Sequence, residues 1–471
     1  MVALICAVVN IAIIVYCFIR KNSVFYPVCL CNLIWLAVHL INFLLGWNCG
    51  EAAYLILMLP SLFFSVGFLV AEKTGLLSKL GKVIIYKIKT ISVCKKIVEV
   101  ACAKTKKAKD FLKKPKFENK DGTLEEYSEA MRPVASTILL AFAAIVFIFF
   151  AYEFFSRLDQ YNEGSVWYTF RVIVWEHGVN DIFIYKYCSS IAFLLPSILL
   201  ISAQRSKKKI DVCKFMVSLV IAIIWSVLRT SRTSTFSVVI IMVMTQILLL
   251  ERKDTKYLTP QELTHIRKIK LGMFAAAVGF IMAIFLLVAL QKETSSYGDV
   301  SLFEFFLKSL ANYTNLSSAA FVEWYKQGVT HTYGTNSFRF VLAVLYKLGL
   351  ISTAPVANSG GLFITFEGFR TNAFTVARAY VEDFGVLYMA LMMMLFGIIH
   401  GEVYGKACRS KGLVKIRYAL INAMLDIPLF FQILTNQYLN VLSGWIQYVV
   451  WICLFTSSAL WIRSKDETDH I

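Results

Sequence analysis

The sequence predicts an all-α, polytopic membrane protein, and two observations lead to this prediction. Hydrophobic residues make up 58% of the 471 positions and charged residues only 17%, which is more apolar surface than a soluble domain needs. The apolar residues also come in blocks of roughly 18–25, long enough to cross a hydrocarbon layer about 30 Å thick. Because backbone polar groups inside lipid must bond within their own segment, each block should be a helix.

About eleven such blocks follow one another, so we expect about eleven transmembrane helices. They lie near 2–19, 24–46, 53–71, 133–152, 182–203, 212–229, 234–250, 271–290, 374–400, 418–435 and 441–462. The first block lacks a charged leader region and a small-residue cleavage site, so we expect a retained helix and not a cleaved signal. The whole chain, 1–471, is expected to be a single integral membrane domain.

Basic residues predict the orientation of these helices. Lys and Arg are in excess in every second connection, namely 20–21, 72–132, 205–209, 251–270, 402–417 and the C-terminal tail. Since basic loops stay in the cytoplasm, we expect a cytoplasmic (inner) membrane protein with its N-terminus outside and its C-terminus in the cytoplasm. The formal net charge of +18 has the same origin, so we expect contacts with membrane lipid and not with nucleic acid.

Two connections are too long to be simple turns. The basic loop 72–132 begins with an amphipathic pattern, which predicts a helix on the lipid surface or, alternatively, against a soluble partner. The loop 291–373 is the largest external region. It contains the apolar run 338–350, which is too short to cross a membrane and is expected to be re-entrant or interfacial. Long ordered loops are usually functional.

Signatures of soluble enzymes are absent from the sequence. It contains no phosphate-binding loop, no HExxH, no GxSxG and no Asp-x-Asp pair that could hold the metal of a nucleotide sugar. We therefore expect neither a metal nor another cofactor.

Arginines near the predicted outer face are unusual, because basic residues normally collect on the cytoplasmic side. Arg229 and Arg232 lie three residues apart in a tight outer turn, and would share one side if a helix continued through both. A guanidinium offers a rigid fork of donors that matches phosphate oxygens. We interpret the pair as a pyrophosphate clamp. The alternative is a pair of side chains that bond lipid phosphates or loop carbonyls.

A second polar cluster runs from the large external loop into the ninth predicted helix. As a helix, it would place Thr371, Thr375, Arg378 and Glu382 on one face, which is costly in a membrane unless that face meets protein or water. The functional interpretation is a wall with donors for phosphate or sugar and a carboxylate for proton transfer. The alternative is an Arg378–Glu382 ion pair that only stabilises the bundle.

Three further residues are weaker candidates. Arg339, in the apolar run, is a cation for the same site or an interfacial anchor. His331 could be a base, although a lone loop histidine is usually solvated. Asp426 lies inside the tenth predicted helix next to Pro428, which should kink it.

These features together resemble the Wzy-type oligosaccharide repeat-unit polymerases. The resemblance rests on the helix layout, on the outer turn Arg-Thr-Ser-Arg-Thr at 229–233, and on a motif in 370–405. That motif reads Thr371-Asn372…Thr375…Arg378…Tyr380…Asp383-Phe384-Gly385…Gly397. The chain departs from the family at Leu387-Tyr388, where members carry a glycine.

The resemblance implies transfer of a growing chain from one undecaprenyl-pyrophosphate-linked oligosaccharide to the sugar of another, on the outer face of the membrane. It implies a surface polysaccharide such as O-antigen or capsule as product, and a chain-length regulator and a flippase as functional partners. The implied catalytic residues are Asp383, Glu382 and His331. The implied pyrophosphate- and sugar-binding residues are Arg229, Arg232, Arg339, Arg370, Arg378, Tyr380, Asn372 and Thr375. An O-antigen ligase and a lipid-linked oligosaccharide flippase are the alternatives.

Overall fold

The computed structural model describes residues 2–21, 23–44, 51–75, 128–158, 169–170, 172–176, 179, 182–229, 232–250, 260–293, 315–353, 363–366 and 369–464. It confirms an all-α, polytopic membrane protein. In this part of the chain, seven helices are long and apolar enough to cross a membrane. They are Val2–Ile19, Pro27–Leu44, Ala53–Thr74, Pro133–Ser156, Ile184–Ser206, Lys209–Leu228 and Val386–Arg409, with shorter apolar helices at Thr233–Leu249 and Leu442–Phe455.

Each of the eleven predicted segments coincides with helical structure. The helices are α1 (Val2–Lys21), α2 (Pro27–Leu44), α3 (Glu51–Ile56), α4 (Leu59–Thr74), α7 (Pro133–Ser156), α9 (Phe183–Ser206), α10 (Lys209–Leu228), α11 (Arg232–Leu249), α12 (Pro260–Glu293), α14 (Arg339–Lys347), α15 (Val376–Phe384), α16 (Val386–Arg409), α17 (Gly412–Phe431) and α18 (Leu442–Phe455). A further helix occupies 315–326, and short turns lie at Val172–Glu176 and Ser458–Leu460. Most of the apolar run 338–350 forms the short helix α14, and its re-entrant or interfacial placement stays a prediction.

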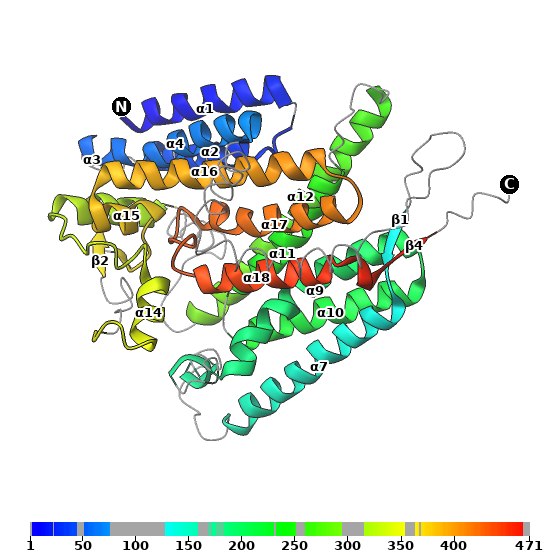
Figure 1. The fold of residues 1–471 in the computed structure, drawn as a ribbon. Helices are drawn as coiled ribbons and strands as arrows, with labels where there is room; N and C mark the ends of the chain where they lie inside the picture. Colours follow the sequence, from blue (N-terminus) through cyan, green and yellow to red (C-terminus); the bar gives the residue numbers. More distant parts are fainter. Residues whose placement is uncertain are drawn as a thin grey trace, which may run out of the picture.

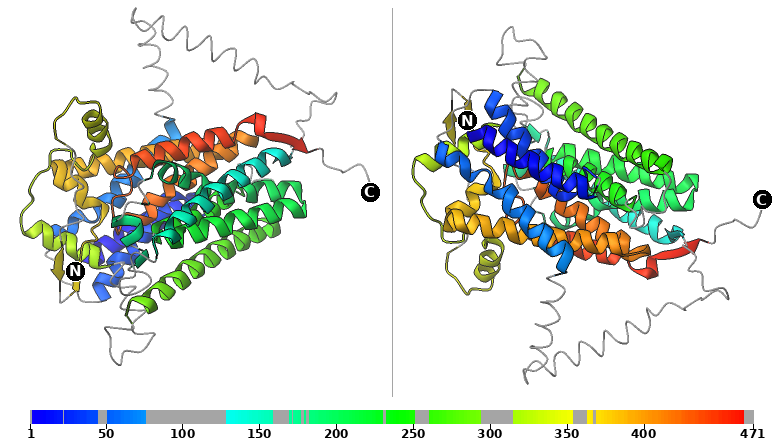
Figure 2. Two further views of the ribbon diagram at one scale, coloured as in Figure 1. Left: turned by 90° about the horizontal axis from the view of Figure 1, so that it is seen from below. Right: turned by 90° about the horizontal axis from the view of Figure 1, so that it is seen from above.

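The long helices lie side by side as a bundle with two distinct ends (Figures 1 and 2). The N-terminus, α14, α15 and β2 (Ile364–Phe366) lie at one end, which we call the α15 end. The strands β1 (Ser128–Met131) and β4 (Trp461–Ser464) lie at the other, which we call the β4 end. The predicted helix at the start of 72–132 falls in 76–127, outside the described residues.

Two small antiparallel sheets lie one at each end, and the sequence did not predict them. At the β4 end, β1 pairs with β4 so that Met131 faces Trp461, and the Met131 amide donates to Ser202 Oγ of α9 at 3.1 Å. At the α15 end, β2 pairs with β3 (Phe369–Thr371). The first sheet joins the start of α7 to the end of the chain, although the two are far apart in the sequence.

The helices α4 and α16 are in close contact, and this contact depends on glycine. A Cβ added to Gly397 would lie 2.1 Å from the Phe64 carbonyl oxygen, and one added to Gly67 would lie 2.1 Å from the Met394 carbonyl oxygen. The two backbones are therefore in direct contact, as in membrane helix pairs that use small residues at the interface.

The outward surface of the bundle is apolar. On α7, Val134, Ile148 and Tyr152 expose 70%, 62% and 72% of their surface. Such a surface would be unfavourable in water and matches lipid, since lipid tails are as apolar as these side chains.

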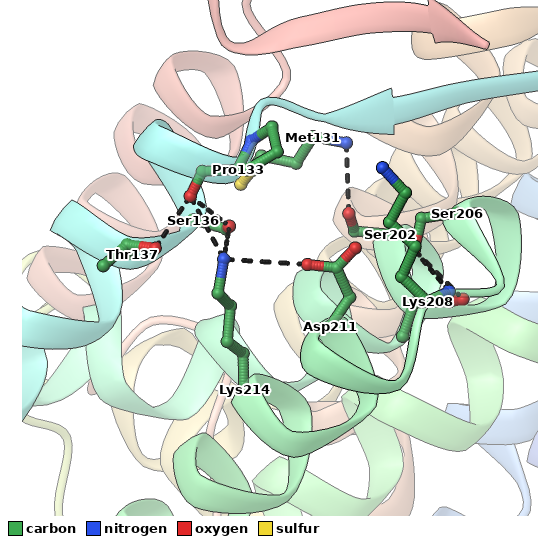
Figure 3. Close-up of polar contacts among 10 residues, drawn as sticks. Met131, Pro133, Ser136, Thr137, Ser202, Ser206, Lys208, Asp211 and Lys214 are labelled. Atoms are coloured by element: carbon green, nitrogen blue, oxygen red, sulfur yellow. Dashed lines mark hydrogen bonds and ion pairs between the residues drawn. The ribbon is translucent and has the colours of Figure 1, made fainter.

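Polar contacts join α10 to α7 at the β4 end (Figure 3). Lys214 Nζ of α10 donates to the Pro133 carbonyl at 3.1 Å and to Ser136 Oγ at 2.9 Å, both on α7. It also lies 3.7 Å from Asp211 Oδ1. The Lys214 and Asp211 side chains are only 11% and 7% exposed, and each has an opposite charge or acceptor beside it. We call Lys214, Asp211, Ser136 and Pro133 the Lys214 cluster.

Candidate functional site

The ninth predicted helix is not continuous, and this corrects the prediction for 374–400. It consists of α15 and α16, separated at Gly385, whose φ of 87° and ψ of −179° are accessible essentially to glycine alone. Thr371 lies in β3, and Thr375 is the residue that precedes the first turn of α15. The polar stripe is therefore carried by the short helix α15 at the end of the bundle, and α16 alone is long and apolar enough to span.

Arg378 is the central side chain of this site. It is 4% exposed, and its guanidinium carbon lies 3.9 Å from the Phe374 ring centroid and 5.4 Å from the Trp324 ring centroid. Arginine commonly stacks on aromatic faces in this way. Burial lowers the pKa of Arg378, and the Glu382 carboxylate raises it. Because arginine ordinarily titrates above about 12, the group stays charged.

The donors of Arg378 are mostly unused. Nη2 lies 3.5 Å from Glu382 Oε1, which is the i, i+4 pair that the sequence offered as the alternative to a functional site. Nε and Nη1 have no hydrogen-bond partner in the described part of the chain, although both are buried. Leaving buried donors unpaired is costly, so such groups are found where another partner is expected.

Glu382 lies beside this cation and remains accessible. Its side chain is 15% exposed, and Oε2 accepts a hydrogen bond from Asn336 Nδ2 at 3.1 Å. The exposed His331 places Nδ1 3.3 Å from the Glu382 carbonyl oxygen, and the Thr332 amide donates to the same carbonyl at 2.9 Å. The structure therefore brings His331 to the end of α15, next to a residue distant from it in the sequence.

Asp383 has a different environment from its neighbour. It is 0% exposed, and Oδ1 accepts from Thr332 Oγ1 at 2.7 Å and from the amide and side chain of Asn336 at 3.1 and 3.2 Å. Oδ2 accepts from the Ser337 amide at 2.7 Å and from Ser337 Oγ at 2.5 Å. With these five bonds the carboxylate anchors 332–337 to α15. Of the two predicted carboxylates, Glu382 is therefore the better placed to accept a proton from a ligand.

The remaining candidates on this segment lie around α15 in different settings. Tyr380 is fully buried and donates to Asn436 Oδ1 at 2.9 Å, so it faces the bundle. Thr375 is buried, and its Oγ1 has no partner among the described residues. Asn372 is exposed just before the helix. Arg370 belongs to β3 by its backbone, and its side chain lies outside what the structure describes.

The other arginines make no described contact with Arg378. Arg339 is the first residue of α14, half-buried, with no hydrogen bond or ion pair to a described residue. Arg229 follows the last residue of α10, whose first turns carry Asp211 and Lys214. Arg232 begins α11, and its side chain is not described. Because α10 ends at Leu228 and α11 begins at Arg232, the two arginines do not share one helix face.

Several residues of the site were not predicted. Trp324 and Phe374 supply the aromatic faces, and Thr332, Asn336 and Ser337 anchor the loop. A signal existed for the loop, because 330–337 is rich in Thr, Asn, Ser and Gly just before a helix, a composition typical of turns that bond a carboxylate. No sequence signal indicated Trp324.

Models of known protein families, curated proteins and solved structures were compared with the chain, and none matches.

Proposed function

We propose that this protein is a membrane glycosyltransferase that polymerises oligosaccharide repeat units carried on undecaprenyl pyrophosphate. In this proposal the α15 end faces outward from the cytoplasmic membrane, where it meets the lipid-linked substrates. The growing chain leaves one lipid carrier and is transferred to a sugar hydroxyl of a new unit on another carrier.

The observation that supports the proposal is that Arg378 is buried with unpaired donors. Its guanidinium is buried beside two aromatic rings, and Nε and Nη1 remain without a partner in the described chain. A charged fork of this kind complements the oxygens of a phosphate. A half-buried carboxylate, Glu382, lies at 3.5 Å, so a cation for the leaving group and a base for the acceptor are close together.

The proposed reaction needs no metal and no nucleotide. The acceptor hydroxyl oxygen forms a bond to the anomeric carbon of the donor sugar as the bond from that carbon to the pyrophosphate oxygen breaks. Glu382, or His331 beside it, takes the hydroxyl proton, which is the role of a general base. The pyrophosphate leaves with the bonding electrons, and Arg378 stabilises the negative charge that develops on it. Arg229, Arg339 and Arg370 are further candidates for binding the second carrier.

The test is a gel of surface polysaccharide from cells that lack this protein. We expect single repeat units without the protein, a ladder of polymer with the wild type, and single units with Arg378→Ala. Arg417→Ala is the matched control, since Arg417 lies on α17 and bonds Thr456 through Nε at 2.9 Å and Nη2 at 3.1 Å. An unchanged ladder without the protein would refute the proposal.

An O-antigen ligase is the nearest alternative, because it would use the same donor and the same cation. The product distinguishes the two. A ladder of repeat units identifies a polymerase, and transfer of a finished chain to a lipid A core or to a protein identifies a ligase.

A lipid-linked oligosaccharide flippase is the second candidate, and one observation favours it. His400 and Asp426 are ionisable side chains buried inside the bundle, where transporters commonly keep such groups. Accumulation of lipid-linked units on the inner leaflet in cells without the protein would support this reading over the polymerase.

A further inference from the structure

A pair of ionisable side chains lies deep in the bundle, away from α15. His400 of α16 and Asp426 of α17 are each 0% exposed, and His400 Nδ1 lies 4.0 Å from Asp426 Oδ1. At 1.5 Å per residue, each lies about 21 Å along its helix from the first residue, Val386 or Gly412. The last residues of the two helices are nearer, with Arg409 about 14 Å from His400 and Phe431 about 8 Å from Asp426 along the helix.

The surroundings of the pair are largely apolar. Phe64 of α4 meets the His400 ring edge to face, with ring centroids 5.0 Å apart. Tyr438, in the segment after α17, approaches the same ring at 6.1 Å. Asn422 Nδ2 donates to Asp426 Oδ2 at 3.0 Å. Asp426 from α17 and Tyr438 from the following segment are thus the titratable groups that contact His400 in the described chain.

The polar atoms of this group have few partners. Both ring nitrogens of His400, Asp426 Oδ1 and the Tyr438 hydroxyl are buried without a hydrogen bond to a described residue. A separation of 4.0 Å is too long for a direct hydrogen bond between His400 and Asp426. A charged pair in low dielectric is favourable only with excellent geometry and further hydrogen bonds, and these are missing here. The neutral state of both groups is therefore the stable one.

We propose that His400 and Asp426 form a proton-binding site within the membrane. Asp426 holds the proton as a neutral carboxylic acid in the resting protein, and His400 is the neutral base that accepts it. Because 4.0 Å is too long for direct transfer, the His400 ring must first move within hydrogen-bond distance of Asp426. The O–H bond of Asp426 then breaks and an N–H bond forms at His400, which gives a transient ion pair. The pair carries one proton in either state, so no net charge is created.

Tyr438 and Asn436 lie between this site and α15. Tyr438 follows Asn436, whose Oδ1 accepts from the Tyr438 amide at 3.1 Å and from the Tyr380 hydroxyl at 2.9 Å. Tyr380 belongs to α15, so Tyr438, Asn436 and Tyr380 lead from the buried pair to the helix that carries Arg378. This is the direction in which we expect the proton to exchange with water.

The test is infrared difference spectroscopy of the full-length protein in lipid bilayers, recorded in H2O and in D2O. We expect Asp426→Asn to remove one band of a protonated carboxyl group that is present in the wild type and that shifts in D2O. Asp211→Asn is the matched control. Asp211 is also buried, but it has a cationic partner in Lys214 Nζ at 3.7 Å, so this variant is expected to leave the band in place.

A second variant tests the role of histidine. His400→Gln should retain the Asp426 band and slow its shift in D2O at least several-fold, because the proton acceptor is gone. If Asp426→Asn prevents folding, Asn422→Val removes the hydrogen bond to Asp426 Oδ2 and should displace the same band instead.

Three results would overturn the proposal. The absence of any band that depends on Asp426 means an ionised carboxylate. A band that never shifts in D2O means a proton that is only structural. A His400→Gln variant that exchanges at the wild-type rate removes histidine from the site. None of these readouts uses polysaccharide, so they are independent of the proposed polymerase activity.

Discussion

Each end of the bundle contains a largely buried cation, and the two cations differ in how many of their donors have partners. At the β4 end, Lys214 has three donors and three neighbours that accept them or balance its charge. At the α15 end, Arg378 has five N–H donors, and Glu382 is the one described residue that pairs with it. A fully satisfied cation joins helices, whereas a buried cation with unused donors is available for a ligand. The β4 end therefore contains a structural cluster, and the α15 end contains a candidate ligand-binding site.

The largest expected effect is on stability at the β4 end. Lys214→Met leaves the Asp211 carboxylate buried without its cation, and losing one partner of a buried pair costs about 3–5 kcal/mol. We expect a matching fall in the free energy of unfolding in detergent, with polymer length unaffected in the protein that folds. The double variant Lys214→Met, Asp211→Asn should recover most of the loss. If it does not, packing and not charge explains the effect of Lys214.

The second effect is on activity at the α15 end. Arg378→Lys keeps the charge but loses the fork, and removal of one such donor typically lowers a rate about 100-fold, or about 2.7 kcal/mol. We expect this loss in the rate of polymer formation from lipid-linked units by the purified protein, with the melting temperature nearly unchanged. A lysine variant with wild-type activity would make Arg378 an ordinary structural cation, like Lys214.

The two adjacent carboxylates provide the third comparison. Asp383→Asn replaces an acceptor of five hydrogen bonds with a group that also donates, and should reduce stability by about 2 kcal/mol. Glu382→Gln keeps its size and an acceptor beside Arg378, and is expected to lower activity with a smaller loss of stability than Asp383→Asn. Thermal melting and polymer assays on both variants check this. Equal effects of the two changes on stability would contradict the division of roles.

The smallest effect is expected at Ser136. Its hydroxyl accepts from Lys214 and donates to the Pro133 carbonyl at 2.9 Å, so Ser136→Ala removes one acceptor while Asp211 remains. We expect a loss of about 1 kcal/mol in the free energy of unfolding. A loss as large as that of Lys214→Met would mean that the hydroxyl, and not the carboxylate, stabilises this end.

The positions of the long helices followed from the sequence, because crossing a membrane needs a long apolar segment with all backbone groups bonded internally. That requirement acts on each segment by itself. Segments that do not cross the membrane are free of this requirement, and their structure was predicted less well. The break at Gly385 was missed because 374–381 is mostly apolar and 386–400 is strongly apolar, so the average hydropathy stays high across it. The strands β1 and β4 were missed because their partners are distant in the sequence.

The sequence by itself identified Arg378 and Glu382 as a pair, since residues four apart on a helix are neighbours. Only the tertiary structure decided what each side chain does. In the folded protein Trp324 lies beside Arg378, and His400 lies near Asp426. The 332–337 loop donates hydrogen bonds to Asp383, whereas Glu382 stays accessible. These contacts join helices and loops far apart in the chain, and no local pattern of residues records which distant segments will meet.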